Sequence, residues 1–301
     1  MHELPSGILI VDKPAHITSA TVVKCIKRFP EVKKAGHTGT LDPFATGVIL
    51  CPINQATRLS RFFLHGWKTY DAVMVLGTET DTQDATGTVI QKQALPVLEN
   101  RAIQEAVTRF QGEISQVPPV YSALKHNGRP LYEYARNGNP IQKPARLVTI
   151  DRIEIKRIGL PEIQFTVSCS SGTYIRTLCA DIGSVLGCGG HLKQLRRIES
   201  SGFKIDEAAP LTGLEQMAAN GRLSENIVPM ARALRGMTAY TADNVLTERI
   251  KYGKIIYLHD VDGIPETDYI KVIDTQENLL AVLSRAESGD RFDYCCVFHH
   301  A

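Results

Sequence analysis

The segment that most constrains this chain is GHTGTLDPFATGVIL, residues 36–50, which joins three glycines to a single carboxylate, Asp42. Glycine permits backbone conformations and close approaches that a Cβ forbids, while Pro43 fixes its own φ and biases Asp42 toward an extended conformation. The apolar residues at 48–50 are typical of a short buried strand behind the loop. The sequence therefore predicts a stiff loop that presents one acid. Its glycines are Gly36, Gly39 and Gly47.

An Asp-Pro pair is also typical of a helix N-terminus, with aspartate as the N-cap and proline at the first helical position. In that arrangement Asp42 would have only a structural role. His37 and Thr38 beside the glycines, and the apolar residues that follow, favour the loop instead. We therefore expect Asp42 to be a catalytic carboxylate.

The composition predicts an ordinary soluble globular protein, since 43% of its 301 residues are hydrophobic. The start, MHELPSGILIVDKP, has no basic region ahead of a long apolar run, so we expect no signal peptide, no membrane span and a cytoplasmic location. Seven cysteines without CxxC spacing argue against a disulfide framework and a zinc site. No HxxxH pair lies near a carboxylate, and we expect no bound metal.

Charge is divided unevenly along the chain. Residues 237–301 contain six Lys or Arg and eleven Asp or Glu, a net charge of −5, which leaves +7 on the rest. Because Lys and Arg supply most nonspecific affinity for nucleic acid, a polyanion-binding surface would belong to the larger N-terminal part.

Residues 120–150 are the best candidate for such a surface, because basic residues and tyrosines are interleaved there and prolines make the segment largely loop. Lys and Arg neutralise phosphates, and tyrosine rings stack on unpaired bases. A solvated basic surface with tyrosines in the core would give the same pattern, so the residues alone leave both interpretations open. The basic residues are Lys125, Arg129, Arg136, Lys143 and Arg146, and the tyrosines are Tyr121, Tyr132 and Tyr134.

Periodicity predicts a chain that mixes strands and helices. A strand over residues 68–76 would put Tyr70 on the same face as core residues. A strand over 163–169 leads into a helical stripe, with Tyr174 and Arg176 at the junction. A charged arginine so close to a buried element needs an anionic partner or a route to water.

Three further segments complete this outline. A strand over residues 8–11 and a helix over about 18–29 precede the glycine-containing loop. The Asp- and Thr-rich segment 78–87 is expected to be a solvated turn, with cation binding as the alternative. Short strand patterns at the C-terminal end predict a small all-β module. These patterns lie at 255–258, 269–273, 279–283 and 294–298.

Several motifs, taken in order, resemble those of the bacterial tRNA pseudouridine-55 synthase family, the TruB type. The resemblance covers most of the chain, and the ordered series is far more specific than any one motif. One departure is His16, which stands where the first motif usually has glycine, in Lys-Pro-x-Gly-x-Thr-Ser. The motifs are GILIVDKPAHITS, GHTGTLDPFATGVIL, KTYDAVMVLGTETDTQDATG, VPPVYSALKHNGRPLYEYAR, SGTYIRTL and LRRI.

The resemblance implies an α+β pseudouridine-synthase fold with a large mixed, mainly antiparallel sheet and a small C-terminal all-β module similar to a PUA domain. The catalytic domain would span residues 1–235, with an RNA-contact insertion at about 115–147, and the module would span 236–301. The implied reaction detaches uracil at N1, turns it and rejoins it through C5, without a cofactor. A uridine of the tRNA T loop, at position 55, would thereby become pseudouridine.

The resemblance also assigns roles to residues. Asp42 matches the catalytic aspartate, Tyr70 the tyrosine beside the target base, and Arg176 the arginine paired with the aspartate. His37 matches a histidine that helps to hold the flipped-out nucleotide, and Tyr174 and Leu195 match residues near the uracil. Together with the basic segment, the expected substrate-binding residues are His37, Tyr174, Leu195, Lys125, Arg129, Arg136 and Arg146.

Other functions fit parts of this pattern. A noncatalytic RNA-binding protein could use the same basic surface, although the intact Asp42, Tyr70 and Arg176 argue against it. A base-releasing glycosylase could use one carboxylate near C1′. The chain also resembles guide-RNA-dependent pseudouridine synthases, but it has no long Lys-rich tail. We expect a monomer that acts on the tRNA T stem-loop without a guide RNA.

Overall fold

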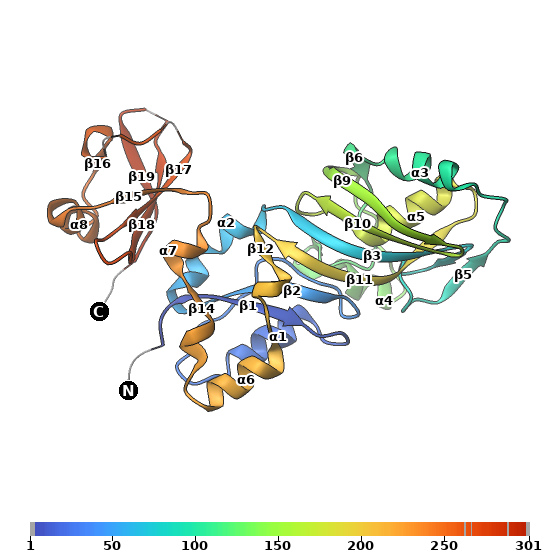
Figure 1. Ribbon diagram of the computed structural model, residues 1–301, viewed down its shortest axis with the longest axis horizontal. Coiled ribbons are helices and arrows are strands. Elements are labelled where there is room, and N and C mark those ends of the chain that lie inside the picture. The colour runs from blue at the N-terminus through green and yellow to red at the C-terminus, as the bar shows by residue number, and fades with distance from the viewer. Residues whose placement is uncertain (1–3, 262, 266, 288, 299–301) are drawn as a thin grey trace.

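The computed structural model describes residues 4–261, 263–265, 267–287 and 289–298. Within these residues ten strands form one large sheet, and five others form a smaller sheet near the C-terminal end (Figure 1). The large sheet runs in the order β13-β1-β2-β11-β3-β10-β9-β6, with β12 beside β11 and β14 beside β1. Its strands are β1 (Gly7–Lys13), β2 (Thr46–Ile53), β3 (Lys68–Leu76), β6 (Gly112–Gln116), β9 (Arg146–Gly159), β10 (Glu162–Cys169), β11 (Gly190–Ser200), β12 (Phe203–Lys204), β13 (Ala209–Pro210) and β14 (Ile227–Pro229).

Pairing in this sheet is mainly antiparallel, as expected. Only β1 with β13 and β2 with β11 pair in parallel among its described strands. Strand β11 lies between β2 and β3, so that Arg197 is the register partner of both Gly47 and Tyr70. The central strands thus bring the exit of the glycine-containing loop next to the strand that carries Tyr70. The predicted α+β fold with a large mixed sheet is confirmed.

Helices pack against this sheet in two groups (Figure 1). Helices α3 (Asn100–Thr108) and α5 (Ile175–Val185) share a core with β3 and β10. Helices α1 (Ser19–Ile26) and α6 (Leu211–Ala219) share a second core with β1 and β2. Helix α1 is shorter than expected and ends at Ile26, but Phe29 still packs in the same core. The first core contains Leu41 and Ala45 on either side of Asp42 and Ile175 beside Arg176, so it anchors both segments.

The basic segment is more regular than its prolines indicated. It forms a hairpin of β7 (Lys125–His126) and β8 (Arg129–Pro130), followed by helix α4 (Leu131–Arg136). Asn127 and Gly128 occupy the turn with φ of 49° and 82°, the left-handed pair that a two-residue hairpin turn requires. The Asn-Gly pair was a readable signal for this hairpin. A second hairpin joins β4 (Thr78–Thr80) to β5 (Val89–Lys92).

The smaller sheet runs in the order β15-β17-β18-β19-β16. Beside it lies helix α8 (Asn244–Lys251), so the C-terminal module is not all-β as expected. Asp243 caps this helix by accepting the Leu246 N–H, and Leu246 and Ile250 share its buried face. The predicted β-sheet module is otherwise present. Its strands are β15 (Thr238–Thr241), β16 (Ile256–Tyr257), β17 (Tyr269–Ile273), β18 (Leu279–Arg285) and β19 (Arg291–Val297).

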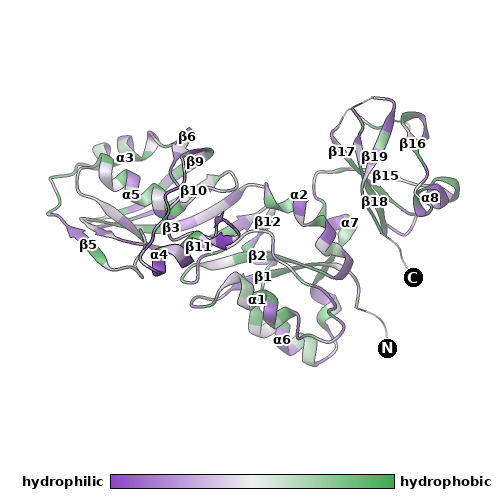
Figure 2. Ribbon diagram, turned by 180° about the vertical axis from the view of Figure 1, so that it is seen from behind, coloured by the Kyte–Doolittle hydropathy of each residue, from purple (hydrophilic) through white to green (hydrophobic). Residues whose placement is uncertain are grey.

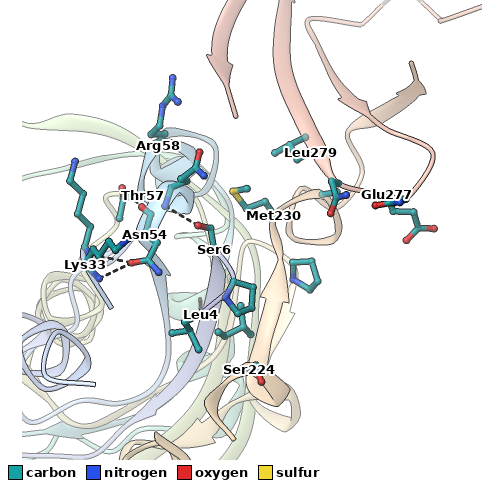
Figure 3. A pocket seen from close by; sticks show the side chains of 18 residues that line it. Leu4, Ser6, Lys33, Asn54, Thr57, Arg58, Ser224, Met230, Glu277 and Leu279 are labelled. Atoms are coloured by element: carbon teal, nitrogen blue, oxygen red, sulfur yellow. Dashed lines mark hydrogen bonds between the residues drawn. The ribbon is translucent and has the colours of Figure 1, made fainter. Parts of the chain in front are cut away.

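The C-terminal sheet packs directly on the body of the protein. Strand β18 is among the most hydrophobic stretches of the ribbon (Figure 2), and Val282 shares one buried cluster with Val48 of the body. The Arg58 guanidinium lies 5.3 Å from the Phe298 ring centroid. A cavity of about 960 Å³ opens at this junction, lined from both sides, for example by Arg58 and by Glu277 (Figure 3). Two short helices, α2 (Ser60–Leu64) and α7 (Met230–Ala233), lie nearby.

Candidate active site

Asp42 lies in an irregular loop that leads into β2, and no helix follows it. The helix-cap interpretation is therefore wrong, and the predicted loop is confirmed. Hydrogen bonds hold the loop on both sides of the acid: the Ser19 hydroxyl accepts the Leu41 N–H at 2.9 Å, and the Pro43 carbonyl accepts the His16 N–H at 2.7 Å. The acid is thus presented from a backbone that is fixed immediately before and after it.

At two of the three loop glycines the backbone geometry explains why glycine is present. Gly39 has a φ of 147° and Gly47 a φ of 107°, in the region that other residues rarely adopt. At Gly47 a Cβ would also lie 2.2 Å from the Arg197 carbonyl oxygen, so no side chain fits between β2 and β11. Gly36 has neither a positive φ nor a crowded Cβ position, and its expected role is not supported.

The Asp42 carboxylate pairs with Arg176 in a bidentate arrangement, as the sequence led us to expect. Arg176 Nε donates to Oδ2 at 2.8 Å, and Nη2 donates to Oδ1 at 3.2 Å. The arginine side chain is only 3% exposed, whereas that of Asp42 is 31% exposed. Planar two-point pairing sets the angle of a carboxylate as well as its position. Asp42 is therefore an aimed acid that solvent or a ligand can reach.

Two backbone carbonyls also hold Arg176 in place. Nη1 donates to the Thr82 carbonyl and Nη2 to the Tyr121 carbonyl, both at 3.0 Å. The first carbonyl belongs to the Asp- and Thr-rich turn and the second to the start of the basic segment. One guanidinium therefore joins three segments that are far apart in the sequence, and the acid shares their rigidity.

The turn at 78–87 is solvated only in part: Asp81, Ala85 and Thr86 are exposed as expected, but the turn also contributes a buried acid to the site. Asp84 is 4% exposed, and its Oδ1 accepts the Thr86 N–H and the hydroxyls of Thr82 and Thr86 at 2.6–2.9 Å. Its Oδ2 lies 3.7 Å from Arg176 Nε. Arg176 therefore lies between two carboxylates, one buried and one facing the surface. Sequence reasoning missed Asp84 because such turn residues are usually solvated.

Tyr70 lies on β3 and is 8% exposed, on the core face as predicted. Burial raises the pKa of its hydroxyl, and the nearby Arg197 guanidinium partly opposes this rise. Arg197 is itself fully buried and donates to the carbonyls of Val48 at 2.6 Å and Gly39 at 3.1 Å. It fastens the loop to the sheet beside Tyr70. Arg197 lies in the LRRI motif, but no role was predicted for it.

Tyr174 lies close to two arginines. Arg146 Cζ is 5.0 Å and Arg176 Cζ is 5.9 Å from the centre of its ring. The buried Gln116 amide clamps the Tyr174 backbone, accepting its N–H at 2.8 Å and donating to its carbonyl at 3.0 Å. Of the basic residues in the segment at 120–150, Arg146 is thus placed beside the site. Gln116 was not predicted to contribute.

Of the remaining predicted residues, two lie in the core or in the catalytic loop and three lie on the surface. Leu195 is in the same core as Tyr70, and the His37 Nδ1 accepts the Gly39 N–H within the loop. Burial, with a smaller effect of Arg197, lowers the pKa of His37, which favours the neutral imidazole. The other three basic residues are exposed on the hairpin and on α4. They are Lys125, Arg129 and Arg136, the last over the Tyr132 ring at 5.4 Å.

The burial of Lys13 beside the catalytic loop can be tested through the pH dependence of protein stability. Its side chain is 0% exposed and donates to the carbonyls of Pro14, Ile17 and Pro43. Burial lowers the pKa of Lys13 from 10.5 to about 8, with Asp42 opposing the shift. Between these values the unfolded chain binds the proton and the folded protein releases it. The free energy of unfolding should therefore rise with pH there, by at most about 1.4 kcal/mol per unit.

The measurement is urea unfolding of the wild type and of Lys13→Met at about pH 7.5 and about pH 9.5. Lys24→Met, at an exposed position of α1, is the control. The free energy of unfolding of the wild type, relative to that of Lys13→Met, should be larger at the higher pH. The same difference between the wild type and Lys24→Met should not change with pH. A Lys13 difference that does not change with pH would contradict a lowered pKa.

Within the described part of the chain, no group of three or more His, Cys, Asp or Glu side chains is arranged to hold a metal ion. No helix among those residues has the length and apolar character needed to cross a membrane.

Comparison with known proteins decides the family. Residues 27–175 match the TruB family pseudouridylate synthase (N terminal domain), and residues 176–235 match the tRNA pseudouridylate synthase B C-terminal domain. The chain belongs to the TruB family of pseudouridylate synthases. The resemblance seen in the motifs is thereby confirmed, and both Asp42 and the Arg176 that pairs with it lie within the matched residues.

Individual relatives agree over nearly the full length. The chain is 40% identical to "tRNA pseudouridine synthase B" of Burkholderia pseudomallei (strain 668), covering 94% of both chains. It is 39% identical to the protein of the same name from Geobacter sulfurreducens, covering 89% of this chain and 90% of that one. Among solved structures, a chain of a Cbf5-Nop10-Gar1 complex matches with a TM-score of 0.76 and 26% identity, over 97% of this chain and 85% of the other.

Proposed function

We propose that this TruB-family enzyme is an isomerase that converts the T-loop uridine at tRNA position 55 to pseudouridine. The observation that carries the proposal is the bidentate Asp42–Arg176 pair, whose carboxylate is partly exposed and close enough to Tyr70 to raise the pKa of its hydroxyl. It is supported by relatives named tRNA pseudouridine synthase B that match over 94% and 89% of the chain.

In this proposal Asp42 carries out the chemistry on the flipped-out nucleotide. Its carboxylate attacks the sugar or the base, or takes a proton from the sugar, and Arg176 keeps it aimed. Tyr70 contributes a buried ring for the uracil, and its hydroxyl is available for proton removal from C5. Because burial raises the pKa of Tyr70, its hydroxyl is protonated at neutral pH and would first have to give up that proton.

The basic segment would hold the RNA around this nucleotide. A target base inside a folded loop has to leave its stack before an enzyme can act on it, at a cost of a few kcal/mol. Arg146 beside Tyr174, and the exposed Lys125, Arg129 and Arg136, can bind phosphates and offset that cost. The Arg176 bond to the Tyr121 carbonyl ties the start of this segment to the catalytic pair.

We further propose that the enzyme acts as a cytoplasmic monomer and without a guide RNA. The absence of a guide RNA is supported by the relatives that match over 94% and 89% of this chain, which are named for tRNA. Adding guide RNA or a partner protein should then leave the rate unchanged, and sedimentation should give the mass of one chain, 33.2 kDa.

The deciding experiment is incubation of unmodified tRNA with the protein, followed by mapping of pseudouridine at nucleotide resolution. We expect one new pseudouridine, at position 55, with no added nucleotide or metal. RNA mass should stay constant and no uracil should appear, since isomerisation moves a base without adding water. Release of free uracil would indicate a glycosylase, and bound but unchanged tRNA would indicate a noncatalytic RNA-binding protein.

A further inference from the structure

Arg197 is a buried cation without a partner of opposite charge. It is 1% exposed, and it donates to the backbone carbonyls of Val48 and Gly39. Among the described residues no carboxylate forms an ion pair with it, and Asp42 is already paired with Arg176. Burial of a charge without a counter-ion is costly, and a neutral donor could bind the same carbonyls. The positive charge of Arg197 is therefore not explained by the fold alone.

The sheet places this guanidinium beside the Tyr70 side chain. Strands β2, β11, β3 and β10 lie side by side (Figure 1), and one row of register partners runs from Gly47 through Arg197 and Tyr70 to Val167. Register partners of an antiparallel pair project from the same face, with Cβ atoms about 4.5–5.5 Å apart. Gly47 has no side chain, and Val167 is apolar and buried. Arg197 is therefore the polar neighbour of Tyr70 in this row.

Among the groups near the Tyr70 hydroxyl, Arg197 is the one that favours its ionised form. Burial raises the pKa of the hydroxyl, and the Arg197 guanidinium, within hydrogen-bonding reach, opposes this rise. Cys169 of β10 and Asp42 of the loop raise the pKa further. Lys68, two residues earlier on β3, donates to backbone carbonyls instead. A negative charge on Tyr70 would thus have one cation to face, and that cation is fixed in place.

We infer that Arg197 is a positioning residue that stabilises the ionised Tyr70 hydroxyl while this hydroxyl acts as the base of the isomerisation. The inference rests on the proposed function, in which Tyr70 removes the proton from C5. An anion that forms only during the reaction gives the unpaired guanidinium its counter-ion, and a prepositioned buried charge is most effective when it acts on such an anion. Arg197 does not have to touch the RNA.

The proton balance of the reaction is consistent with this role. Isomerisation replaces the N1–C1′ bond by a C5–C1′ bond and moves one proton from C5 to N1. Once C5 has joined C1′, N1 has a double bond to C6 and can accept the Tyr70 proton. The Tyr70 anion then takes the proton from C5, the C5–H electron pair becomes the C5–C6 double bond, and the C6–N1 pair returns to N1. Tyr70 ends protonated, as it began, and Arg197 faces the anion between the two transfers.

The alternative is that Arg197 only fastens the catalytic loop to the sheet. The two roles predict opposite effects when its charge is removed. Loss of a stabilising cation makes Tyr70 harder to ionise, whereas a loosened loop admits water, which makes a buried hydroxyl easier to ionise. The ionisation of Tyr70 therefore distinguishes the two roles.

The test measures that ionisation directly in the free enzyme. Tyr70 is replaced by a difluorotyrosine, whose more acidic hydroxyl titrates at lower pH, and its fluorine NMR signal is followed against pH. Arg197→Met and Arg197→Gln remove the charge, and Arg197→Lys keeps the charge without the planar guanidinium. Arg196→Met is the matched control, because Arg196 precedes Arg197 on β11, points to the other face of the sheet and pairs with Asp12.

In Arg197→Met and Arg197→Gln the titration midpoint should rise by about one to three pH units, the usual effect of losing a nearby opposite charge. Arg196→Met should titrate as the wild type does. A midpoint that falls or stays constant in the uncharged variants would overturn the inference. If neither of them shows a cooperative thermal melt, Arg197→Lys decides: a midpoint equal to that of the wild type or higher would support the inference, and a lower one would overturn it.

A kinetic readout connects Arg197 to the removal of the C5 proton. The substrate is tRNA whose target uridine carries either hydrogen or deuterium at C5. In Arg197→Met the single-turnover rate should fall at least about tenfold, and the ratio of the hydrogen rate to the deuterium rate should exceed that of the wild type, because proton removal has become slow. A lower rate with an unchanged ratio would overturn the inference. A wild type that forms no pseudouridine would instead refute the proposed function, and the fluorine titration would still test Arg197 and Tyr70.

Discussion

Asp42→Asn should fold, bind tRNA nearly as the wild type does, and form no measurable pseudouridine. An amide has neither the charge nor the nucleophilicity of the carboxylate, so we expect the rate to fall by at least about four orders of magnitude. Binding should persist because the basic segment remains unchanged. Folding should persist because the Asp42 side chain is 31% exposed and the loop is held by Ser19 and His16.

The measurement is single-turnover product formation with excess enzyme, together with tRNA binding and a thermal melt. Asp151→Asn is the control, since it makes the same chemical change at an exposed position of β9. Product formation by Asp42→Asn within about a hundredfold of the wild type would remove Asp42 from the chemistry and leave the family fold without its assigned acid.

Arg176→Lys should also be severely impaired, although it keeps the positive charge. The guanidinium donates at once to both Asp42 oxygens and to the carbonyls of Thr82 and Tyr121, whereas an ammonium cannot match this planar arrangement. We expect the single-turnover rate to fall at least about a hundredfold, since the acid is no longer aimed. The unpaired buried carbonyls should also cost about 1–3 kcal/mol of stability each.

A binding assay distinguishes this effect from loss of the substrate. The dissociation constant for tRNA should stay within about fivefold of the wild type, because Arg176 is buried and faces protein groups. Arg152→Lys, at an exposed ion pair with Glu154, is the control and should behave as the wild type. A rate for Arg176→Lys within about threefold of the wild type would show that orientation of Asp42 does not limit catalysis.

The loop position of Asp42, the ion pair of Arg176 and the core-facing position of Tyr70 could be predicted, because each residue is in a short motif and carries its own physical signal. Asp42 is the only carboxylate of its loop, Arg176 is a charge next to a buried element, and Tyr70 follows the alternation of its strand. The ordered motifs also indicated the family and the sheet. Local patterns were sufficient where the chemistry of a residue depends on its immediate neighbours.

Other contributors to the site could not be predicted from local patterns, because their partners are distant in the chain. Asp84 becomes a site residue only when its turn folds under Arg176, and Gln116 only when β6 lies beside Tyr174. Arg197 acts through carbonyls at positions 39 and 48, which no side-chain pattern reveals. The domain boundaries at 1–235 and 236–301 stay a prediction.

The order of strands in the large sheet has a consequence for synthesis of the protein. Strand β11 lies between β2 and β3, and Arg176 enters from the helix that precedes it, 134 residues after Asp42. A nascent chain that has not yet emerged through Ser200 lacks the strand that joins the two halves. Competence to modify RNA should therefore appear late in translation and all at once, which would keep incomplete polypeptides from acting on tRNA at the ribosome.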